Sequence, residues 1–228
     1  MIRIATLIAA VCVCAVATQQ IVEISEQDRV LNLSKGDPAV LAEMLLSRAE
    51  LERHACGAEA TANETDSDRL ATAITVVESF ATTRFHRTAE SLVIHTAVWL
   101  GIAVPDLSIG EGQIRVSTAE RALQTYDARV PSDIGERRKI ALRLLDPCGG
   151  HRLGVLVLKL LATERGVATT ALDHKKIVML AAAYNGQSPA RSPYDMVPNQ
   201  TYNEVVYNLF LALCFQAIRT NPRKTSGN

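Results

Sequence analysis

Apolar positions follow the spacing of amphipathic helices over most of the chain after residue 37, and no segment shows the clear alternation of a half-buried strand. The clearest arc begins after Asp66, where apolar residues recur three and four positions apart up to Ala81. The pattern predicts a mainly helical protein. The helices expected are Pro38–His54, Asp66–Phe85, Thr88–Leu100, Ser117–Tyr126, Ser132–Leu145, His151–Arg165, Thr170–Tyr184 and Thr201–Arg219.

Helix-ending signals divide these segments. Gly101 and Gly166 each follow an apolar helical run, as a glycine at a helix C-terminus does. Asp146-Pro147 is expected to stop the preceding helix, and Asn185-Gly186 the one that ends at Tyr184, with one of the two in the left-handed conformation. Ser117-Thr118-Ala119-Glu120 has the form of a capping box that starts a helix.

The first residues have the layout of a secretory signal peptide. Arg3 precedes an apolar run from Ile4 to Val16, and small residues end at Ala17. The run is shorter than the roughly 20 residues of a membrane-spanning helix, so cleavage after Ala17 is favoured over a permanent anchor. A lipoprotein that uses Cys12 or Cys14 is the alternative. We therefore expect a signal peptide at 1–17 and a periplasmic or secreted protein.

The remaining chain divides into three parts. Residues 18–65 form an N-terminal segment with one short helix, residues 66–220 form a single helical domain, and residues 221–228 form a flexible polar tail. The chain has 24 Lys and Arg against 24 Asp and Glu, with 48% hydrophobic and 4% aromatic residues. This balance is typical of a globular protein and argues against nucleic-acid binding through bulk charge.

Three cysteines follow the signal segment. Cys56 and Cys148 stand beside glycines in polar surroundings that are typical of loops, whereas Cys214 lies in an apolar helix and is expected to be buried. Because disulfides persist outside the cytoplasm, Cys56 and Cys148 are the candidate pair. The histidines are scattered and indicate no metal site.

Glu78 is the first candidate for chemistry. It lies at the edge of the apolar arc that includes Ile74 and Val77, where partial desolvation should raise the pKa of its carboxyl toward the range of a general acid. An ordinary helix glutamate that extends to water is the alternative.

Two later segments add polar groups between helices. Gly110-Glu111-Gly112-Gln113 joins two glycines to an amide, and glycines allow the backbone to approach a ligand closely. Ala183-Tyr184-Asn185 ends an apolar helix with a phenol and an amide, although it could be a helix cap and nothing more.

Taken in order, these segments resemble the lytic transglycosylases of the lysozyme-like superfamily, with their SLT-type domain. That family carries a Glu-Ser pair, here Glu78-Ser79, then a Gly-x-x-Gln segment ending here at Gln113, and an Ala-Tyr-Asn helix end at 183–185. A later family tyrosine corresponds to Tyr202 or Tyr207, and Tyr202 is preferred because Thr201 precedes it. The sequence departs from the family at Glu111, where a bulky apolar residue is usual, and at Ser117, where proline is usual.

The resemblance implies a lysozyme-like fold, mainly α within the α+β superfamily, with at most a small β element near the Gly-x-x-Gln segment. It implies a bacterial enzyme, a lyase, that cleaves the β-1,4 bond between N-acetylmuramic acid and N-acetylglucosamine in peptidoglycan and leaves a 1,6-anhydro end. Glu78 would be the single catalytic acid and base, with Ser79, Gln113, Tyr184, Asn185 and Tyr202 as substrate-binding residues. The expected partners are the glycan strands of the cell wall, with a secretion or conjugation apparatus as a further option; no cofactor and no metal is implied, and a monomer is expected.

Two other functions stay open. A goose-type-like lysozyme on the same scaffold would use Glu111 or Asp106 as a second carboxylate that activates water. A secreted helical module could instead bind glycan or a protein partner without turnover. The products released from purified peptidoglycan separate the three.

Overall fold

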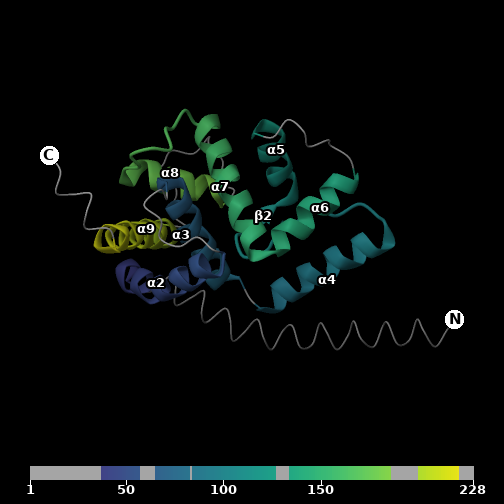
Figure 1. The fold of residues 1–228 in the computed structure, drawn as a ribbon, viewed down its shortest axis with the longest axis horizontal. Helices are drawn as coiled ribbons and strands as arrows, with labels where there is room; N and C mark the ends of the chain where they lie inside the picture. The colour runs from purple at the N-terminus through teal and green to yellow at the C-terminus, as the bar shows by residue number, and fades with distance from the viewer. Residues whose placement is uncertain (1–36, 57–64, 83, 127–133, 186–199, 221–228) are drawn as a thin grey trace.

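The computed structural model describes residues 37–56, 65–82, 84–126, 134–185 and 200–220 (Figure 1). Within these ranges the protein is mainly helical and contains one two-stranded sheet, as the sequence predicted. The elements are α2 (Pro38–Ala55), α3 (Asp66–Ala81), α4 (Arg84–Leu100), β1 (Ser108–Ile109), β2 (Ile114–Arg115), α5 (Val116–Tyr126), α6 (Ile134–Leu145), α7 (Pro147–Glu164), α8 (His174–Tyr184) and α9 (Gln200–Thr220).

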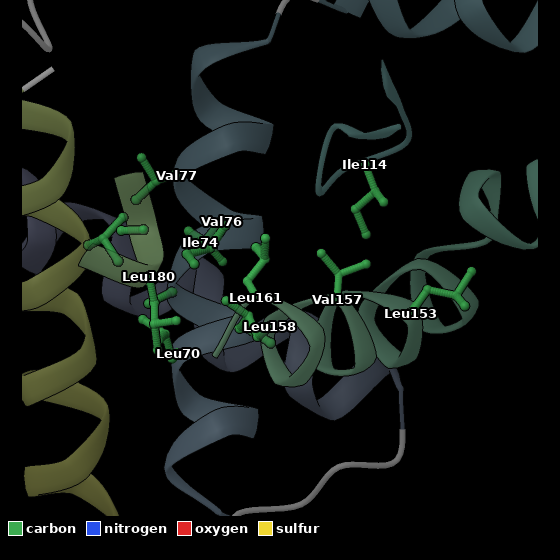
Figure 2. Close-up of a cluster of buried hydrophobic side chains, with 14 of the residues drawn as sticks. Leu70, Ile74, Val76, Val77, Ile114, Leu153, Val157, Leu158, Leu161 and Leu180 are labelled. Atoms are coloured by element: carbon green, nitrogen blue, oxygen red, sulfur yellow. The ribbon is translucent and has the colours of Figure 1, made fainter. Parts of the chain in front are cut away.

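The core lies where α3, α7, α8 and α9 meet. α9 packs against α2, α3 and α8, and α7 packs against α3, α5, α6 and α8. Leu70 and Ile74 of α3, Leu158 of α7 and Leu180 of α8 are buried in this shared cluster (Figure 2). α3 is buried over most of its length, so the residues at its C-terminal end are held in a fixed frame.

α3 begins where the sequence predicted and ends earlier. The Thr65 hydroxyl accepts from the Asp68 backbone N–H, and the Asp68 carboxylate accepts from the Thr65 N–H, which forms a capping box. The helix ends at Ala81 rather than Phe85, because Thr82 adopts an extended backbone. α4 then begins at Arg84 rather than Thr88, so the expected boundary between the two helices was wrong by about one turn.

The start of α5 has a different cap from the one expected. The helix begins at Val116, one residue before the expected cap, and Ser117 lies inside its first turn. The backbone N–H and the hydroxyl of Ser117 both donate to the Asp106 carboxylate, at 2.8 and 2.9 Å. The prediction of a capping box at Ser117 was therefore wrong, because the group that caps the helix is the carboxylate of Asp106, eleven residues earlier in the chain.

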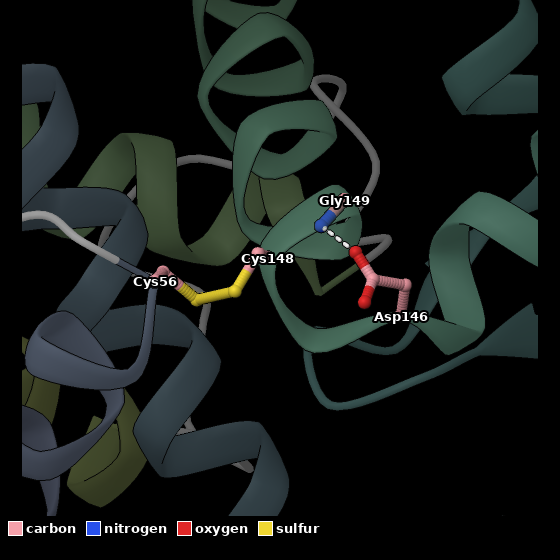
Figure 3. The surroundings of a disulfide bond; sticks show 4 residues. All are labelled: Cys56, Asp146, Cys148 and Gly149. Atoms are coloured by element: carbon pink, nitrogen blue, oxygen red, sulfur yellow. Dashed lines mark hydrogen bonds between the residues drawn. A yellow bond between two sulfur atoms is a disulfide. The ribbon is translucent and has the colours of Figure 1, made fainter.

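The predicted start of α7 was also wrong. The true first turn of this helix carries the disulfide (Figure 3). α7 begins at Pro147 instead of His151, because the Asp146 carboxylate caps it by accepting from the Gly149 N–H at 2.6 Å. Cys148 therefore lies in a first helical turn, not in a loop, and is bonded to Cys56 with Cα atoms 5.2 Å apart. The pairing predicted from the sequence is present in the structure. Cys214 is half-buried against the core.

α8 begins at His174 rather than Thr170, because the Asp173 carboxylate accepts from the Lys176 N–H at 2.9 Å. At its other end Asn185 has φ −75° and ψ 19°, so Asn185 is not the left-handed residue that one expectation placed there. Gly186, the other choice, lies outside the described residues. The remaining helix limits agree with the sequence to within two residues.

The structure has a small β element near the Gly-x-x-Gln segment, which is the most that the resemblance allowed. β1 and β2 pair antiparallel, with Ser108 opposite Arg115, and the turn between them contains Gly110 and Gln113. Gly110 has φ +75°, and a Cβ there would lie 2.1 Å from the Leu144 carbonyl oxygen of α6. Glycine is thus required because the turn packs on α6, and not because a ligand approaches at this position.

Three expectations fall on residues outside the described ranges: the signal peptide at 1–17, most of the segment 18–65, and the tail at 221–228. Among the helices that are described, none is both long enough and apolar enough to cross a bilayer.

Candidate active site

A cleft of about 530 Å³ opens between the C-terminal ends of α3 and α8, the β1–β2 turn, α5 and α7. Of the described residues around it, four are candidates from the sequence: Glu78, Gln113, Tyr184 and Asn185. The others that line it are Thr82, Ser108, Ile114, Arg115, Thr118, Arg121, Val157, Leu161 and Ala183. The cleft therefore gathers side chains from segments more than a hundred residues apart.

Glu78 is a carboxylic acid in surroundings that disfavour its charge. Burial raises the pKa of Glu78 to about 7, and the hydrogen bond from Tyr202 opposes that rise. The Tyr202 hydroxyl donates to Glu78 Oε1 at 2.7 Å. Near neutral pH the group can therefore hold a proton or release it, as a general acid and base must.

Two tyrosines surround this carboxyl. Burial and the charge of Glu78 raise the pKa of both Tyr184 and Tyr202 well above the usual range, so both phenols keep their protons. Tyr207, the other candidate for the later tyrosine, packs edge-on against His174 with ring centroids 4.4 Å apart. The structure thus brings Tyr202, the preferred residue, to the acid.

The Tyr184 hydroxyl is buried next to the β1–β2 turn. Within the described part of the chain it has no hydrogen-bond partner. It lies 2.9 Å from the place where a Cβ of Gly112 would stand, and 3.7 Å from the corresponding place at Gly154. Gly112 is accordingly the glycine whose missing side chain gives Tyr184 its room.

Gln113 faces the cleft from a left-handed backbone conformation, with φ 49°. Its Nε2 donates to the Gly110 carbonyl at 2.9 Å and lies 3.2 and 3.4 Å from the two carboxylate oxygens of Glu90. Asn185 also lines the cleft, at the end of α8, where it is exposed. Both amides that the sequence selected therefore reach the cleft.

Ser79 is not among the residues that line the cleft. Its side chain is 1% exposed, and its hydroxyl accepts from Arg48 of α2 and from Arg87 of α4, the latter at 3.2 Å. The structure places Ser79 behind the acid, where it ties α3 to two neighbouring helices.

The two candidates for a second carboxylate also lie outside the cleft lining. Glu111 is half-buried in the β1–β2 turn. Asp106 is held by Ser117 and lies 3.4 Å from Arg137. Although burial alone would raise the pKa of Asp106, the hydrogen bonds from Ser117 and the charge of Arg137 outweigh it and lower that pKa. Asp106 therefore stays ionised as a cap for α5.

Sequence reasoning missed three charged residues at the site. Arg115 and Arg121 line the cleft, and Arg121 also lies 3.4 Å from the Glu164 carboxylate. Glu90 is 5% exposed behind Gln113. The burial of Glu90 could have been predicted from the sequence. Glu90 precedes the buried Ile94 and Ala97 by one and two helical turns, so this acid lies on the apolar face of its helix.

This geometry offers one titratable acid, the phenol of Tyr184, two amides and two guanidinium groups around a cleft large enough for a sugar-sized ligand. Tyr202 is not among the residues that line the cleft and meets the site through its bond to Glu78. The comparisons assign no family: no family model, no curated protein and no solved structure matches this chain.

Proposed function

We propose that the protein is a peptidoglycan lytic transglycosylase with the lysozyme-like fold, in which Glu78 is the acid and base. The observation that carries the proposal is the isolation of this carboxyl: among the described residues that line the cleft, Glu78 is the one carboxylic acid, and its pKa is raised to about 7. The family resemblance of the three motifs adds support, because Glu78, Gln113, Tyr184 and Asn185 meet at a single cleft.

A lone acid is the arrangement that transglycosylation requires. Ordinary retaining and inverting glycosidases use two carboxyl groups, one as acid and one as nucleophile or base. In the proposed reaction Glu78 protonates the leaving glycosidic oxygen, and the resulting carboxylate accepts the proton of the C6 hydroxyl as that oxygen attacks C1. The glycosidic bond breaks, the 1,6-anhydro ring closes, and no water is consumed.

The neighbours of Glu78 suit both halves of this cycle. While the acid holds its proton, burial favours the neutral form. After transfer, the Tyr202 hydroxyl stabilises the carboxylate through its bond to Oε1. Positioning the C6 hydroxyl within the same molecule replaces a bimolecular step and contributes to the rate by proximity.

The test is the end group of the products from purified peptidoglycan, measured by mass spectrometry of the released muropeptides. The proposal expects 1,6-anhydro ends from the mature protein. Reducing ends would identify a lysozyme-type hydrolase, and no release by a folded protein that still binds the glycan would identify a binding module. Either of these two results would contradict the proposal.

A further inference from the structure

The side-chain amide of Gln113 is held in one orientation by groups that do not touch the cleft. Its Nε2 is 2.9 Å from the Gly110 carbonyl oxygen and 3.2 Å from Glu90 Oε1. A carbonyl oxygen and a carboxylate are both acceptors, so the atom that faces them must be the NH2 group. The opposite orientation would bring Gln113 Oε1 against two other acceptors.

Glu90 is itself fixed on several sides. His86 Nε2 lies 2.8 Å from Glu90 Oε1, and the Gly110 backbone N–H also bonds to the carboxylate. Glu90 is 5% exposed and is not among the residues that line the cleft. Because α4 carries Glu90 and the β1–β2 turn carries Gln113, this cluster connects a helix outside the cleft to an amide that lines it.

From this geometry we infer that Glu90 is a positioning residue that fixes Gln113 as a hydrogen-bond acceptor, so that the cleft binds an N–H or O–H donor of its ligand at that point. Both hydrogens of the amide are already committed, one to Gly110 and one to Glu90. Only the oxygen of Gln113 remains for a ligand. The left-handed backbone conformation of Gln113 is strained for a residue other than glycine, and the hydrogen bonds of this cluster help to stabilise it.

The inference rests on the proposed function for the kind of ligand: a glycan of N-acetylated sugars offers hydroxyl and acetamido N–H groups as donors. The orientation of the amide does not depend on that function. The experiment therefore measures the two separately.

The first measurement is NMR of the free protein labelled with 15N and 13C, with the Gln113 side-chain signals assigned by their loss in Gln113→Met. We expect a scalar coupling through the hydrogen bond between Gln113 Nε2 and the Gly110 carbonyl carbon, and slow exchange of both amide hydrogens with solvent. Absence of the coupling together with fast exchange would overturn the inference, whatever the protein acts on.

The second measurement adds a GlcNAc–MurNAc tetrasaccharide to the Glu78→Gln variant, which should bind without turnover. We expect the coupling to Gly110 to persist while the Gln113 carbonyl carbon signal shifts. Loss of the coupling on binding would show that Gln113 donates to the ligand and would overturn the inference. If no tetrasaccharide binds, the proposed function fails, while the result from the free protein still decides the amide orientation.

The third measurement tests Glu90 by replacement in the same background. Glu90→Gln keeps the shape and an acceptor oxygen but loses the charge, so we expect tetrasaccharide binding to weaken about threefold to tenfold, which is the range of one ordinary hydrogen bond. In the active protein the change should appear in KM more than in kcat. Glu43→Gln, the same replacement at an exposed position of α2, is the matched control. Equal affinity of the two variants would contradict the role of Glu90.

Discussion

Glu78 on α3 is a half-buried glutamate and Glu90 on α4 a buried one, and the two differ in the number of hydrogen-bond donors around them. Burial raises the pKa of each. Glu78 borders the cleft, and within the described residues its carboxyl accepts one side-chain hydrogen bond, from Tyr202. Glu90 is surrounded by Gln113, His86 and Gly110 and does not border it. In the proposed function, the carboxyl that gives up and regains a proton has few hydrogen-bond donors around it, whereas the carboxyl proposed to position a neighbour is surrounded by them.

The largest expected effect is on catalysis by Glu78 itself. Glu78→Gln removes the transferable proton and keeps the side-chain volume, so glycan cleavage should fall by about 10²–10⁴-fold or more. The release of anhydro-muropeptides measures this loss, with circular dichroism to confirm folding and Glu43→Gln as the control. Near-wild-type activity of a folded Glu78→Gln protein would contradict the proposal that Glu78, unlike Glu90, is the catalytic acid.

The comparison also depends on a packed framework, since burial is what raises both pKa values. The disulfide ties the end of α2 to the start of α7. Cys56→Ser with Cys148→Ser should lower the free energy of unfolding by about 2–5 kcal/mol. Urea denaturation of the oxidised protein measures the change, with Cys214→Ser as a control that keeps the bridge and loses less. Equal stability of the oxidised and reduced wild type would contradict this prediction.

The raised pKa of Glu78 makes stability depend on pH in a defined direction. The folded state holds this proton up to pH about 7, while the unfolded chain releases it near 4.5. Its contribution to stability is thus present below pH 4.5 and is lost as pH rises through about 7.

Glu78→Gln removes this dependence. Relative to wild type, the variant should gain about 2–4 kcal/mol in the free energy of unfolding between pH 4 and pH 8, because each tenfold difference in acid dissociation constant between the folded and unfolded states corresponds to about 1.4 kcal/mol. Denaturation at the two pH values measures the gain. A constant difference between variant and wild type would mean that burial does not perturb this acid.

The hydrogen bond to Glu78 can be removed by itself. Tyr202→Phe should raise the pKa of Glu78 further, because this bond is the influence that lowers it. Loss of the bond to the carboxylate should reduce activity about tenfold to a hundredfold, and the fall of activity at alkaline pH should move to higher pH. The pH profile measures both effects. Tyr207→Phe on the same helix is the control, and a matching loss there would contradict the role of Tyr202.

The smallest effect is expected at Glu111. This residue is absent from the cleft lining, so Glu111→Gln should change cleavage by less than about twofold and leave the anhydro ends unchanged. Activity and end-group analysis measure the two quantities together. A severe loss accompanied by reducing ends would make Glu111 a second catalytic carboxylate and favour the lysozyme alternative.

The features that could be predicted from the sequence are those with local causes. Gly101 and Gly166 end helices with positive φ, as their positions after apolar runs indicated. Glu78 could be recognised because its neighbours on one helix determine its burial.

The features that were missed depend on contacts between distant segments. Asp106 caps α5 from another part of the chain, and the two arginines on Ser79 come from α2 and α4. Glu90 reaches Gln113 only because α4 packs beside the β1–β2 turn. No spacing along one helix encodes such a contact.

The disulfide also gives the molecule a particular covalent topology. It closes a ring between two residues that are 92 positions apart, and this ring contains Glu78, Glu90 and Gln113. Tyr184, Asn185 and Tyr202 belong to the linear chain outside it. One backbone cut inside the ring would therefore leave a single oxidised molecule, and reduction would separate it into two fragments. A cut between Asn185 and Gln200 would instead end the covalent connection between Tyr202 and the acid even with the bridge intact, so that only the packing of α9 would hold them together.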